Sequence, residues 1–326
     1  MLKIFDGIIA VVGSVGFFML LFWVSNAIVE RLPERWERRL KPWVFVAPAL
    51  FFIILFLIYP AVRTLVLSFA DRQGEGFVGL TNFVGLLKDP AFQSTMLNTL
   101  LWILVVPAIS VAIGLLVAVL TDRLSSRGEK VSKSLIFLPM AISMVGASTI
   151  WRFVYEWRPE GQEQIGLLNQ LWVAIGGQPQ VWMQISSGRL NSFLLMVILI
   201  WLQVGFAMVL LSAAIKNVPS DTLEAARVDG ANEFQLFFLV VVPQIKITVL
   251  TVFITILMGV LKVFDIVYVM TGGNYDTNVV ALAFFKELFT YRHSGRSAAI
   301  VVLLMLAVIP VIIYQVRSFK AEGIAK

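Results

Sequence analysis

The stretch NVPSDTLEAARVDGANEFQLFFLVVVP, residues 217–243, lies between two membrane-length hydrophobic blocks, yet it has the pattern of ordered, water-facing structure. Pro219 is expected to stop the helix that precedes it. Asp221, followed three residues later by Glu224, predicts a capping box that opens a new helix. A folded cytoplasmic or extracytoplasmic element is therefore expected between the two blocks.

The new helix is expected to be short and to turn a corner. The pair Asp229-Gly230 ends it, because glycine tolerates the left-handed backbone that a helix C-cap requires. Asn232 and Gln235 can then cap a second helix that runs through the apolar residues 234–239. The predicted arrangement is a helix, a glycine corner and an apolar helix.

One face of the first helix is suited to docking. Asp221, Glu224 and Arg227 are spaced by three residues and share a polar face. Ala225 and Ala226 are small and leave room for another backbone to approach. The alternative is a passive amphipathic helix that rests on the membrane surface without a partner.

The composition is that of a membrane protein. Of the 326 residues, 59% are hydrophobic and 14% are charged, and the mean hydropathy is +0.88. A soluble domain is far less apolar. The net charge of +6 does not indicate nucleic-acid binding, because basic residues of polytopic membrane proteins flank the cytoplasmic helix ends. We expect a lipid bilayer around the chain and no nucleic-acid partner.

Residue usage excludes several kinds of chemistry. The chain has no cysteine and a single histidine, His293, which we expect to be a solvated residue of an outer loop. Thiolate sites, zinc sites and His-based catalytic groups cannot be built from these residues. No Gly-x-x-x-x-Gly-Lys-Ser/Thr loop is present to hold ATP phosphates. The chain is therefore predicted to be no enzyme and to bind no cofactor or metal.

Seven hydrophobic segments are long enough to cross a bilayer, which takes about 20 residues. They are predicted at 7–29, 43–69, 97–121, 134–156, 191–216, 243–269 and 297–316. The first is interpreted as a true span and not a signal peptide, because Glu30-Arg31 follows it in place of a small-residue cleavage site. The predicted fold class is all-α, a polytopic membrane protein with about seven transmembrane helices.

The distribution of Lys and Arg predicts the orientation. Fifteen of them lie in the segments 30–42, 122–133 and 216–246 and in the C-terminal tail, and eight lie in the segments on the other side. The positive-inside rule then places the N-terminus outside and the C-terminus in the cytoplasm. Three outer loops follow, at 70–96, 157–190 and 270–296. Their tryptophans are expected to belong to the interface belt: Trp157, Trp172 and Trp182.

The spacing in the opening stretch resembles a known motif. Glu224-Ala225-Ala226 is followed after three residues by Gly230 and after nine more by Val240-x-Val242-Pro243. This pattern resembles the EAA loop of importer permeases of the ATP-binding-cassette (ABC) class. In that family the loop sits in a cleft of the cytoplasmic ATPase subunit. The resemblance implies the coupling residues Glu224, Ala225, Ala226, Asp229 and Gly230.

The resemblance extends over nearly the whole chain, to the maltose-permease-like family of carbohydrate permeases, including those of the alpha-glucoside type. The motifs that carry it include Tyr59-Pro60, Gly79-Leu80-Thr81-Asn82-Phe83, Asn98-Thr99, Leu138-Pro139, Trp151-Arg152, Leu167-Leu168-Asn169 and Phe264-Asp265-Ile266-Val267-Tyr268-Val269-Met270-Thr271-Gly272-Gly273. It implies an importer transmembrane domain at 43–326, with the coupling loop at 217–243. Residues 1–42 would be an added N-terminal helix and a basic linker.

The same resemblance implies a set of partners. The chain would be one subunit of a sugar importer in the inner membrane of a bacterial or archaeal cell. A second permease subunit would complete a heterodimer, and a dimer of ATPase subunits would carry ATP and Mg. An extracytoplasmic sugar-binding protein would deliver an oligosaccharide or glycoside.

A sugar site needs amides, hydroxyls and aromatic rings more than strong charges. The candidates by depth and residue type are Trp201 and Gln203 on the fifth span and Phe264 and Tyr268 on the sixth, although each could equally serve helix packing. The resemblance places sugar contacts at 256–263, where this chain has mostly aliphatic side chains.

Lys262 and Asp265 are ionisable residues of the sixth span, which makes them candidates for the substrate pathway. Being three residues apart, they are expected to pair with each other, and a purely structural pair near the interface is the alternative.

Two other classes of transport protein remain open. An ion-coupled secondary transporter would have inverted repeats and ionisable residues near the bilayer midplane. An ABC permease for a non-sugar solute, such as a polyol or glycerol phosphate, would share every feature of the coupling loop. A membrane-embedded enzyme would need paired acidic residues or a metal motif in a loop, and neither stands out.

Overall fold

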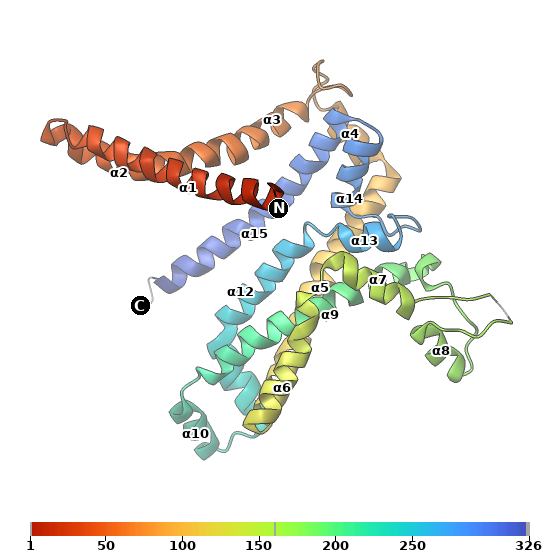
Figure 1. Cartoon of the computed structure of the whole chain (residues 1–326). Coiled ribbons are helices and arrows are strands. Elements are labelled where there is room, and N and C mark those ends of the chain that lie inside the picture. Colours follow the sequence, from red (N-terminus) through yellow and green to blue (C-terminus); the bar gives the residue numbers. More distant parts are fainter. Residues whose placement is uncertain (1, 160, 324–326) are drawn as a thin grey trace. The chain divides into compact units, whose positions relative to one another are not determined.

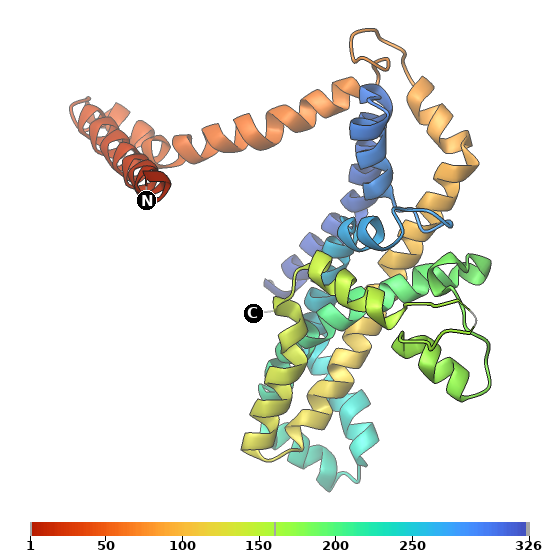
Figure 2. The ribbon, with the colours of Figure 1, turned by 45° about the vertical axis from the view of Figure 1, so that its right-hand side comes forward.

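The computed structural model describes residues 2–159 and 161–323, and every regular element in these ranges is helical. The chain divides into two compact units, Met1–Val66 and Leu67–Lys326. Figure 1 and Figure 2 show the helices of the chain in two views. The all-α class predicted from the sequence is confirmed.

The N-terminal unit contains a helical hairpin. Helix α1 (Leu2–Val29) and helix α2 (Glu34–Ile53) are joined by a short turn and pack against each other. Most of the segment 30–42, expected to be a linker, is therefore the start of α2. Glu34 in the first turn of α2 complements the positive end of the helix dipole and pairs with Arg38 at 2.6 Å.

Helix α2 continues into a much longer apolar run. A π-helical turn (Ile54–Ile58) links it to α3 (Tyr59–Leu67), so that Glu34–Leu67 forms one 34-residue span. Pro60 has no N–H to donate to the preceding turn, and a widened π turn accommodates the lost bond. The second predicted span is present, and it begins nine residues before the predicted position 43.

The second unit holds the remaining helices. Its long helices are α5 (Pro90–Asp122), α6 (Ser126–Phe137), α9 (Leu190–Lys216), α12 (Val242–Val260) and α15 (Ser294–Gly323). Its short helices are α4 (Thr81–Lys88), α7 (Met144–Val154), α8 (Leu167–Ala174), α10 (Ser220–Val228), α11 (Glu233–Gln235), α13 (Asp265–Met270) and α14 (Val280–Phe285).

Helices α5, α9 and α12 build the core of this unit. Buried aliphatic and aromatic side chains from all three form one cluster, with Trp102 fully enclosed. The helices α5 and α9 approach closely at Gly114, where an added Cβ would come within 2.5 Å of the Ala207 Cβ. Small residues at such a crossing let two backbones meet, as is usual where membrane helices associate.

The predicted span 134–156 is not a single helix. Helix α6 ends at Phe137, a 3₁₀ turn (Leu138–Ala141) follows, and α7 leaves at an angle of 103°. Pro139 interrupts the backbone ladder, and Ser143 caps α7 by accepting a hydrogen bond from the Gly146 N–H at 3.1 Å. The predicted span 134–156 is therefore a bent pair of helices, which together can count as one span.

The predicted span 243–269 is also corrected. The helix runs over Glu233–Val260, ten residues earlier than expected at its start, and residues 261–264 separate it from α13. The backbone of Phe264 leaves helical geometry at φ −138°, ψ −54°. Hydropathy alone does not reveal this break because both sides of it are apolar.

The number of spans follows from these corrections. Five helices of the described ranges are long and apolar enough to cross a membrane, or six if the bent pair α6–α7 counts as one span. By the same measure the apolar part of α1, Gly16–Val29, is a shorter helix. The spans predicted at 97–121 and 191–216 lie within two of the five helices, and the span predicted at 297–316 overlaps the fifth, Ser294–Tyr314. The total of seven stays a prediction.

Buried asparagines position the loops of the second unit. Asn98 on α5 donates hydrogen bonds to the carbonyl groups of Asp276 and Asn278, and its own carbonyl oxygen accepts from Arg189. Asn169 on α8 is fully buried and binds Glu156, Gln180 and Trp182. Both residues belong to motifs noted in the sequence, and here they tie loops to helices.

Two loop residues differ from their expected roles. Trp182 is 8% exposed and donates its indole N–H to Asn169 Oδ1 at 3.0 Å, so it belongs to the core of the loop and not to an interface belt. His293 is half-buried, and its Nδ1 accepts a hydrogen bond from the Arg296 N–H at 3.1 Å at the start of α15. Its role is to cap a helix and not to face solvent freely.

Candidate functional site: the α10 corner

Helix α10 begins differently from the prediction. It starts at Ser220, and Pro219, which has no side-chain acceptor, occupies the N-cap position. The capping box predicted from Asp221 and Glu224 was therefore wrong. Asp221 lies inside the first turn, where its carboxylate complements the helix dipole without capping.

The glycine corner is present as predicted. Gly230 has φ +88°, and two hydrogen bonds close the helix end: Gly230 N–H to Arg227 O and Ala231 N–H to Ala226 O, both at 3.0 Å. This is the Schellman arrangement, in which a left-handed residue lets the chain reverse over the last turn. A Cβ built at Gly230 would meet nothing within 4 Å. The corner therefore faces open space within this chain.

The second predicted cap is also present. Asn232 accepts a hydrogen bond from the Gln235 N–H at 2.9 Å, and Gln235 Oε1 accepts from the Asn232 N–H at 3.0 Å. The helix that it opens is not a separate apolar element, however. It passes through a π-helical stretch (Leu236–Val241) directly into α12. The segment 217–243 thus ends on the first turns of a core helix.

A small hydrophobic joint anchors α10. Val218, Val241 and Ile245 form a buried cluster, and Leu223 of α10 packs against it together with Phe237. Val218 lies in the turn between α9 and α10, Phe237 and Val241 lie in the π-helical stretch, and Ile245 lies in the first turn of α12. Leu223 of α10 is therefore in a packed cluster with residues that adjoin or lie on two core helices.

The outer surface of α10 is open. Glu224, Ala225, Asp229 and Gly230 are exposed, whereas Ala226 is half-buried. The Glu224 carboxylate has no hydrogen-bond or ion-pair partner anywhere in residues 2–159 and 161–323.

The predicted polar face of Asp221, Glu224 and Arg227 differs in the structure, because Arg227 turns toward the residues after the corner. Arg227 pairs across the corner with Glu233 at 3.2 Å and not with Glu224 on its own helix. Val228, which is 87% exposed, adds an apolar side chain to the same tip. A free carboxylate, small residues and an exposed valine form a surface suited to a partner.

A charge cluster lies behind α10, and the sequence analysis did not identify it. Lys133 contacts Asp122 at 3.1 Å and Glu129 at 2.5 Å, and Lys216 contacts both carboxylates as well. Ser212 donates a hydrogen bond to Asp122 at 3.0 Å. The cluster joins α6 to the C-terminal ends of α5 and α9. Its one sequence signal was the i,i+4 pair Glu129–Lys133.

Two candidate substrate residues lie on α9. Trp201 is half-buried and meets the ring of Trp151 of α7 edge to face at 5.9 Å. Gln203 is half-buried, and its side-chain amide makes no hydrogen bond with the described residues. The indole is thus partly used for packing, and the amide is free.

The other candidates lie on or just before α13, which packs against α7 and α9. Phe264 and Tyr268 stack at 5.0 Å, and Phe285 of α14 joins them at 4.9 Å from Phe264. Trp201, Phe264 and Phe285 all pack against the same core cluster. The structure therefore brings the aromatic candidates onto neighbouring elements, and it adds Phe285, which the sequence analysis missed.

The expected ion pair of this region is not formed. Lys262 is exposed in the break after α12, Asp265 is half-buried at the start of α13, and no ion pair joins them. Because the helix is broken between them, the three-residue spacing no longer places them on one face. Arg152 of α7 instead donates to the Val269 carbonyl group and ties α7 to α13. In the described ranges no cluster of three or more carboxylate or histidine side chains could hold a metal ion.

Comparison with known proteins agrees with the motif. The family model of the binding-protein-dependent transport system inner membrane component matches residues 110–320. The alpha-glucoside transport system permease protein AglF of Rhizobium meliloti is 43% identical, with 98% of each chain covered. The osmoprotective compounds uptake permease protein GgtC of Synechocystis is 50% identical over 86% of this chain and 99% of its own.

The fold is similar to that of a solved transporter. A chain of a bacterial ABC transporter involved in the import of the acidic polysaccharide alginate superposes with a TM-score of 0.75 at 19% identity, covering 88% of this chain and 99% of its own. The matched family range includes the α10 corner, α9, α12 and the C-terminal part of α5 from residue 110. The chain belongs to the family of inner membrane components of binding-protein-dependent transport systems, the permeases of ABC importers.

Proposed function

We propose that this chain is the permease subunit of an ABC importer for a sugar or glycoside, and that the α10 corner couples it to the ATPase. The observation that carries the proposal is the corner itself, which is anchored to α9 and α12 and exposed at Glu224 and Gly230. Relatives named for alpha-glucoside, lactose and arabinooligosaccharide transport support the substrate class. The chain is a transport subunit and not an enzyme, and ATP hydrolysis belongs to a separate subunit.

The mechanism we propose is mechanical. Closure of an ATPase dimer around ATP and Mg moves α10, which lies at the end of the bundle away from α7 and α13 (Figure 1). The hydrophobic joint at Val218 and Leu223 passes this movement to α9 and α12. Because the core is close-packed at crossings such as Gly114, these helices move as rigid bodies and do not absorb the movement. The residues assigned to coupling are Glu224, Ala225, Ala226, Asp229 and Gly230.

The proposed assembly follows from a chain that lacks a P-loop. We propose an ATPase dimer, a second permease subunit in a heterodimer and an extracytoplasmic sugar-binding protein as partners. A solved alginate transporter of similar fold was crystallised in complex with a periplasmic protein bound to an alginate pentasaccharide.

The chain is a multi-pass membrane protein, and we propose that its N-terminus is outside and its C-terminus in the cytoplasm. The bias of Lys and Arg toward 30–42, 122–133 and 216–246 supports this orientation. We also propose that residues 1–42 are an addition to an importer domain at 43–326.

For the substrate pathway we propose the aromatic residues near α13. The rings of Trp201, Phe264 and Tyr268 offer faces for a sugar ring, and Gln203 offers a free amide for its hydroxyl groups. Lys262 and Asp265, being unpaired, remain candidates for polar contacts at the same level.

A second candidate substrate is an osmoprotective compound. The 50% identity to the permease GgtC favours it. A glycerol phosphate is less favoured, since the permease UgpA of Yersinia pseudotuberculosis, named for that solute, is 26% identical. Both candidates keep the same coupling mechanism and differ in the solute alone.

The coupling proposal is tested by Glu224→Gln, which removes the charge and keeps the shape. The chain is co-expressed with the proposed partners, which are an ATPase, a second permease and a binding protein. We expect less ATPase to co-purify, because losing one partner of a buried charge pair typically costs about 2 to 5 kcal/mol. Glu233→Gln is the matched control, since it removes a carboxylate from an exposed pair that contributes little. Equal co-purification of both variants would contradict the coupling role of Glu224.

The substrate is tested separately, by measuring ATP hydrolysis of the reconstituted complex with maltose, sucrose or glycine betaine. Stimulation by the two alpha-glucosides supports the sugar assignment. Stimulation by glycine betaine alone would favour the second candidate. Uptake driven by an ion gradient without ATP would favour a secondary transporter over both.

A further inference from the structure

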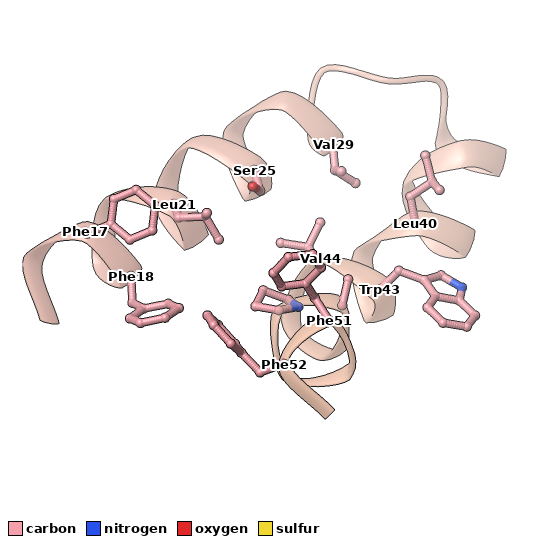
Figure 3. A pocket seen from close by; sticks show the side chains of 12 residues that line it. Phe17, Phe18, Leu21, Ser25, Val29, Leu40, Trp43, Val44, Phe51 and Phe52 are labelled. Carbon is pink, nitrogen blue, oxygen red and sulfur yellow. The ribbon is translucent and has the colours of Figure 1, made fainter. Parts of the chain in front are cut away.

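A polar cavity lies between α4, the start of α5, the end of α14 and the start of α15, and the substrate pathway described above does not include it. Its volume is about 230 Å³. Most of its lining side chains are polar or charged, among them Asp89, Thr95, Asn278, Lys286, Glu287 and Arg296. The cavity between α1 and α2, by contrast, is lined almost entirely by apolar side chains (Figure 3). The smaller cavity therefore has a lining that can recognise a polar solute.

A packed floor supports the polar cavity. Leu86, Phe92, Ala283 and Ile300 line it, and all four belong to one buried hydrophobic cluster of the second unit. Side chains in a close-packed cluster hold fixed positions. The polar groups of the lining are therefore carried by rigid elements and not by a loose surface.

The charges of the lining balance one another. Arg296 pairs with Asp89 at 2.5 Å and with Glu287 at 3.0 Å, and the Glu287 side chain is only 15% exposed. Lys286 is half-buried and forms neither a hydrogen bond nor an ion pair with another described residue. Burial lowers the pKa of its ammonium group. With two cations and two carboxylates, the lining has no net charge and favours a neutral ligand over an ion.

Two buried polar atoms of the lining have no hydrogen-bond partner among the described residues, Asn278 Oδ1 and Arg296 Nε. The Nε atom lies 3.0 Å from Glu287 Oε1, which is close enough for an ion pair but does not form a hydrogen bond. The amide of Asn278 is held in place, because its Nδ2 donates to Thr95 Oγ1 at 3.2 Å. Buried polar atoms in native proteins nearly always have a partner. The cavity thus offers a ligand one acceptor and, with Lys286, two donors.

The acceptor and the ammonium group are close together beside Gly273. A Cβ built at this glycine would be 2.8 Å from Asn278 Oδ1 and 3.2 Å from Lys286 Nζ, so these two atoms are at most 6.0 Å apart. A hydroxyl group can donate one hydrogen bond and accept another, each about 3 Å long. One hydroxyl group therefore reaches both atoms.

We propose that this cavity binds one neutral sugar unit through its hydroxyl groups, as a subsite separate from the aromatic residues near α13. The proposal rests on the proposed function, a permease for a sugar or glycoside. One hydroxyl group donates to Asn278 Oδ1 and accepts from Lys286 Nζ, and another accepts from Arg296 Nε. The volume is below the range of about 300 to 1,000 Å³ that is common for drug-sized ligands, so the cavity admits a single sugar unit and not an oligosaccharide.

The orientation proposed for the chain places this subsite at its outer side. Asn278, Lys286 and Arg296 belong to the segment 270–296, which the distribution of Lys and Arg assigns to an outer loop. A sugar that arrives from outside the cell meets this subsite before it reaches the membrane interior. The subsite would therefore act on entry of the solute and not on its release.

The test measures binding of methyl alpha-D-glucoside to the purified full-length chain by ligand-detected nuclear magnetic resonance. Lys286→Met removes the ammonium group and keeps an unbranched side chain, and it is expected to weaken binding roughly ten-fold. Lys88→Met is the matched control, because Lys88 is exposed at the end of α4, forms no ion pair in the described chain and does not line the cavity. It is expected to bind like the parent. Glycine betaine, which has no hydroxyl group, is expected not to bind.

A second arm locates the bound sugar. Because the chain has no cysteine, Ala91→Cys creates a unique thiol at an exposed position of the lining. Methyl alpha-D-glucoside should slow the reaction of this thiol with a small methanethiosulfonate reagent. Lys88→Cys lies outside the cavity and should react at the same rate with and without the sugar. Equal protection at both positions, or protection at neither, would overturn the subsite.

The subsite and the proposed function can fail separately. If the parent chain does not bind the glucoside, or Lys286→Met binds it as tightly as the parent, the subsite is wrong, and stimulation of ATP hydrolysis by maltose in the reconstituted complex still supports a sugar permease. If glycine betaine alone stimulates the complex while glucoside binding still depends on Lys286, the subsite stands and the proposed substrate class is wrong.

Discussion

At the scale of single residues, a substitution at Gly230 can distinguish backbone strain within this chain from a clash with a partner subunit. Its φ of +88° disfavours any side chain, yet a Cβ there would meet nothing within 4 Å. The intrinsic cost of a left-handed residue is roughly 1 to 2 kcal/mol. A loss of function larger than this strain explains must therefore come from contact with another subunit.

The prediction is that Gly230→Val abolishes ATP-driven uptake while membrane levels of the chain stay normal. Gly176 is the matched control, with φ +91° and no atom within 4 Å of an added Cβ. Gly176→Val imposes similar strain away from the α10 corner and is expected to leave uptake near the parent level. Uptake assays with quantified membrane levels check this, and equal defects in both variants would show that strain alone is responsible.

Asn169 is a second residue whose role is measurable. It is fully buried, donates to the Glu156 and Gln180 carbonyl groups and accepts from Gln180 and Trp182. Asn169→Leu leaves several buried polar groups without partners, at about 1 to 3 kcal/mol each. We expect loop 157–190 to become sensitive to brief proteolysis. Gln170→Ala removes one bond from a neighbouring exposed residue and is expected to keep the loop resistant.

At the scale of elements, the charge cluster behind α10 holds three helix ends together. Lys216 is the last residue of α9 and contacts Asp122 of α5 and Glu129 of α6. These ion pairs hold the end of α9, from which the segment 217–243 continues. The cluster has two cations and two anions, which makes it sensitive to any single change of sign.

The predicted result of Lys216→Glu is loss of coupling, seen as ATP hydrolysis that no longer responds to substrate. The double variant E129K/K216E keeps one charge of each sign at the two positions and should recover a substantial part of the coupling. Lys246→Glu is the control, because Lys246 is exposed on α12 and forms no ion pair in the described chain. A double variant as uncoupled as the single one would mean that Lys216 acts by its size or position and not by its charge.

At the scale of the whole molecule, orientation is the property with the widest consequences. The absence of cysteine allows single cysteines to be placed at will. Cysteines at positions 39 and 127 should react with a membrane-impermeant maleimide only after the cells are opened, and one at position 178 should react in intact cells. Glu224→Cys is expected to follow the first group. The reverse pattern would place α10 outside the cell and exclude contact with a cytoplasmic ATPase.

Much of the α10 corner, the proposed coupling site, was predictable because its signals are local. The positive φ at Gly230 and the capping box of Asn232 and Gln235 depend on a few neighbouring residues. The start of α10 was predicted wrongly, since Pro219 occupies the N-cap and moves Asp221 into the first turn. Register errors of one or two residues at helix ends are expected from local signals alone.

The membrane class, the all-helical fold and the glycine corner after α10 could be predicted from the amino-acid sequence, because hydropathy, length and turn chemistry act within short segments of chain. The positions at which apolar runs break, 138–143 and 261–264, became visible in the three-dimensional structure, since apolar residues on both sides hide each break in the sequence. The three-dimensional structure also shows which distant residues meet: Lys216 with Glu129, Phe264 with Phe285, and Asn98 with the loop at Asp276. Contacts of this kind depend on how helices pack in three dimensions, and no period or spacing along the chain encodes them directly.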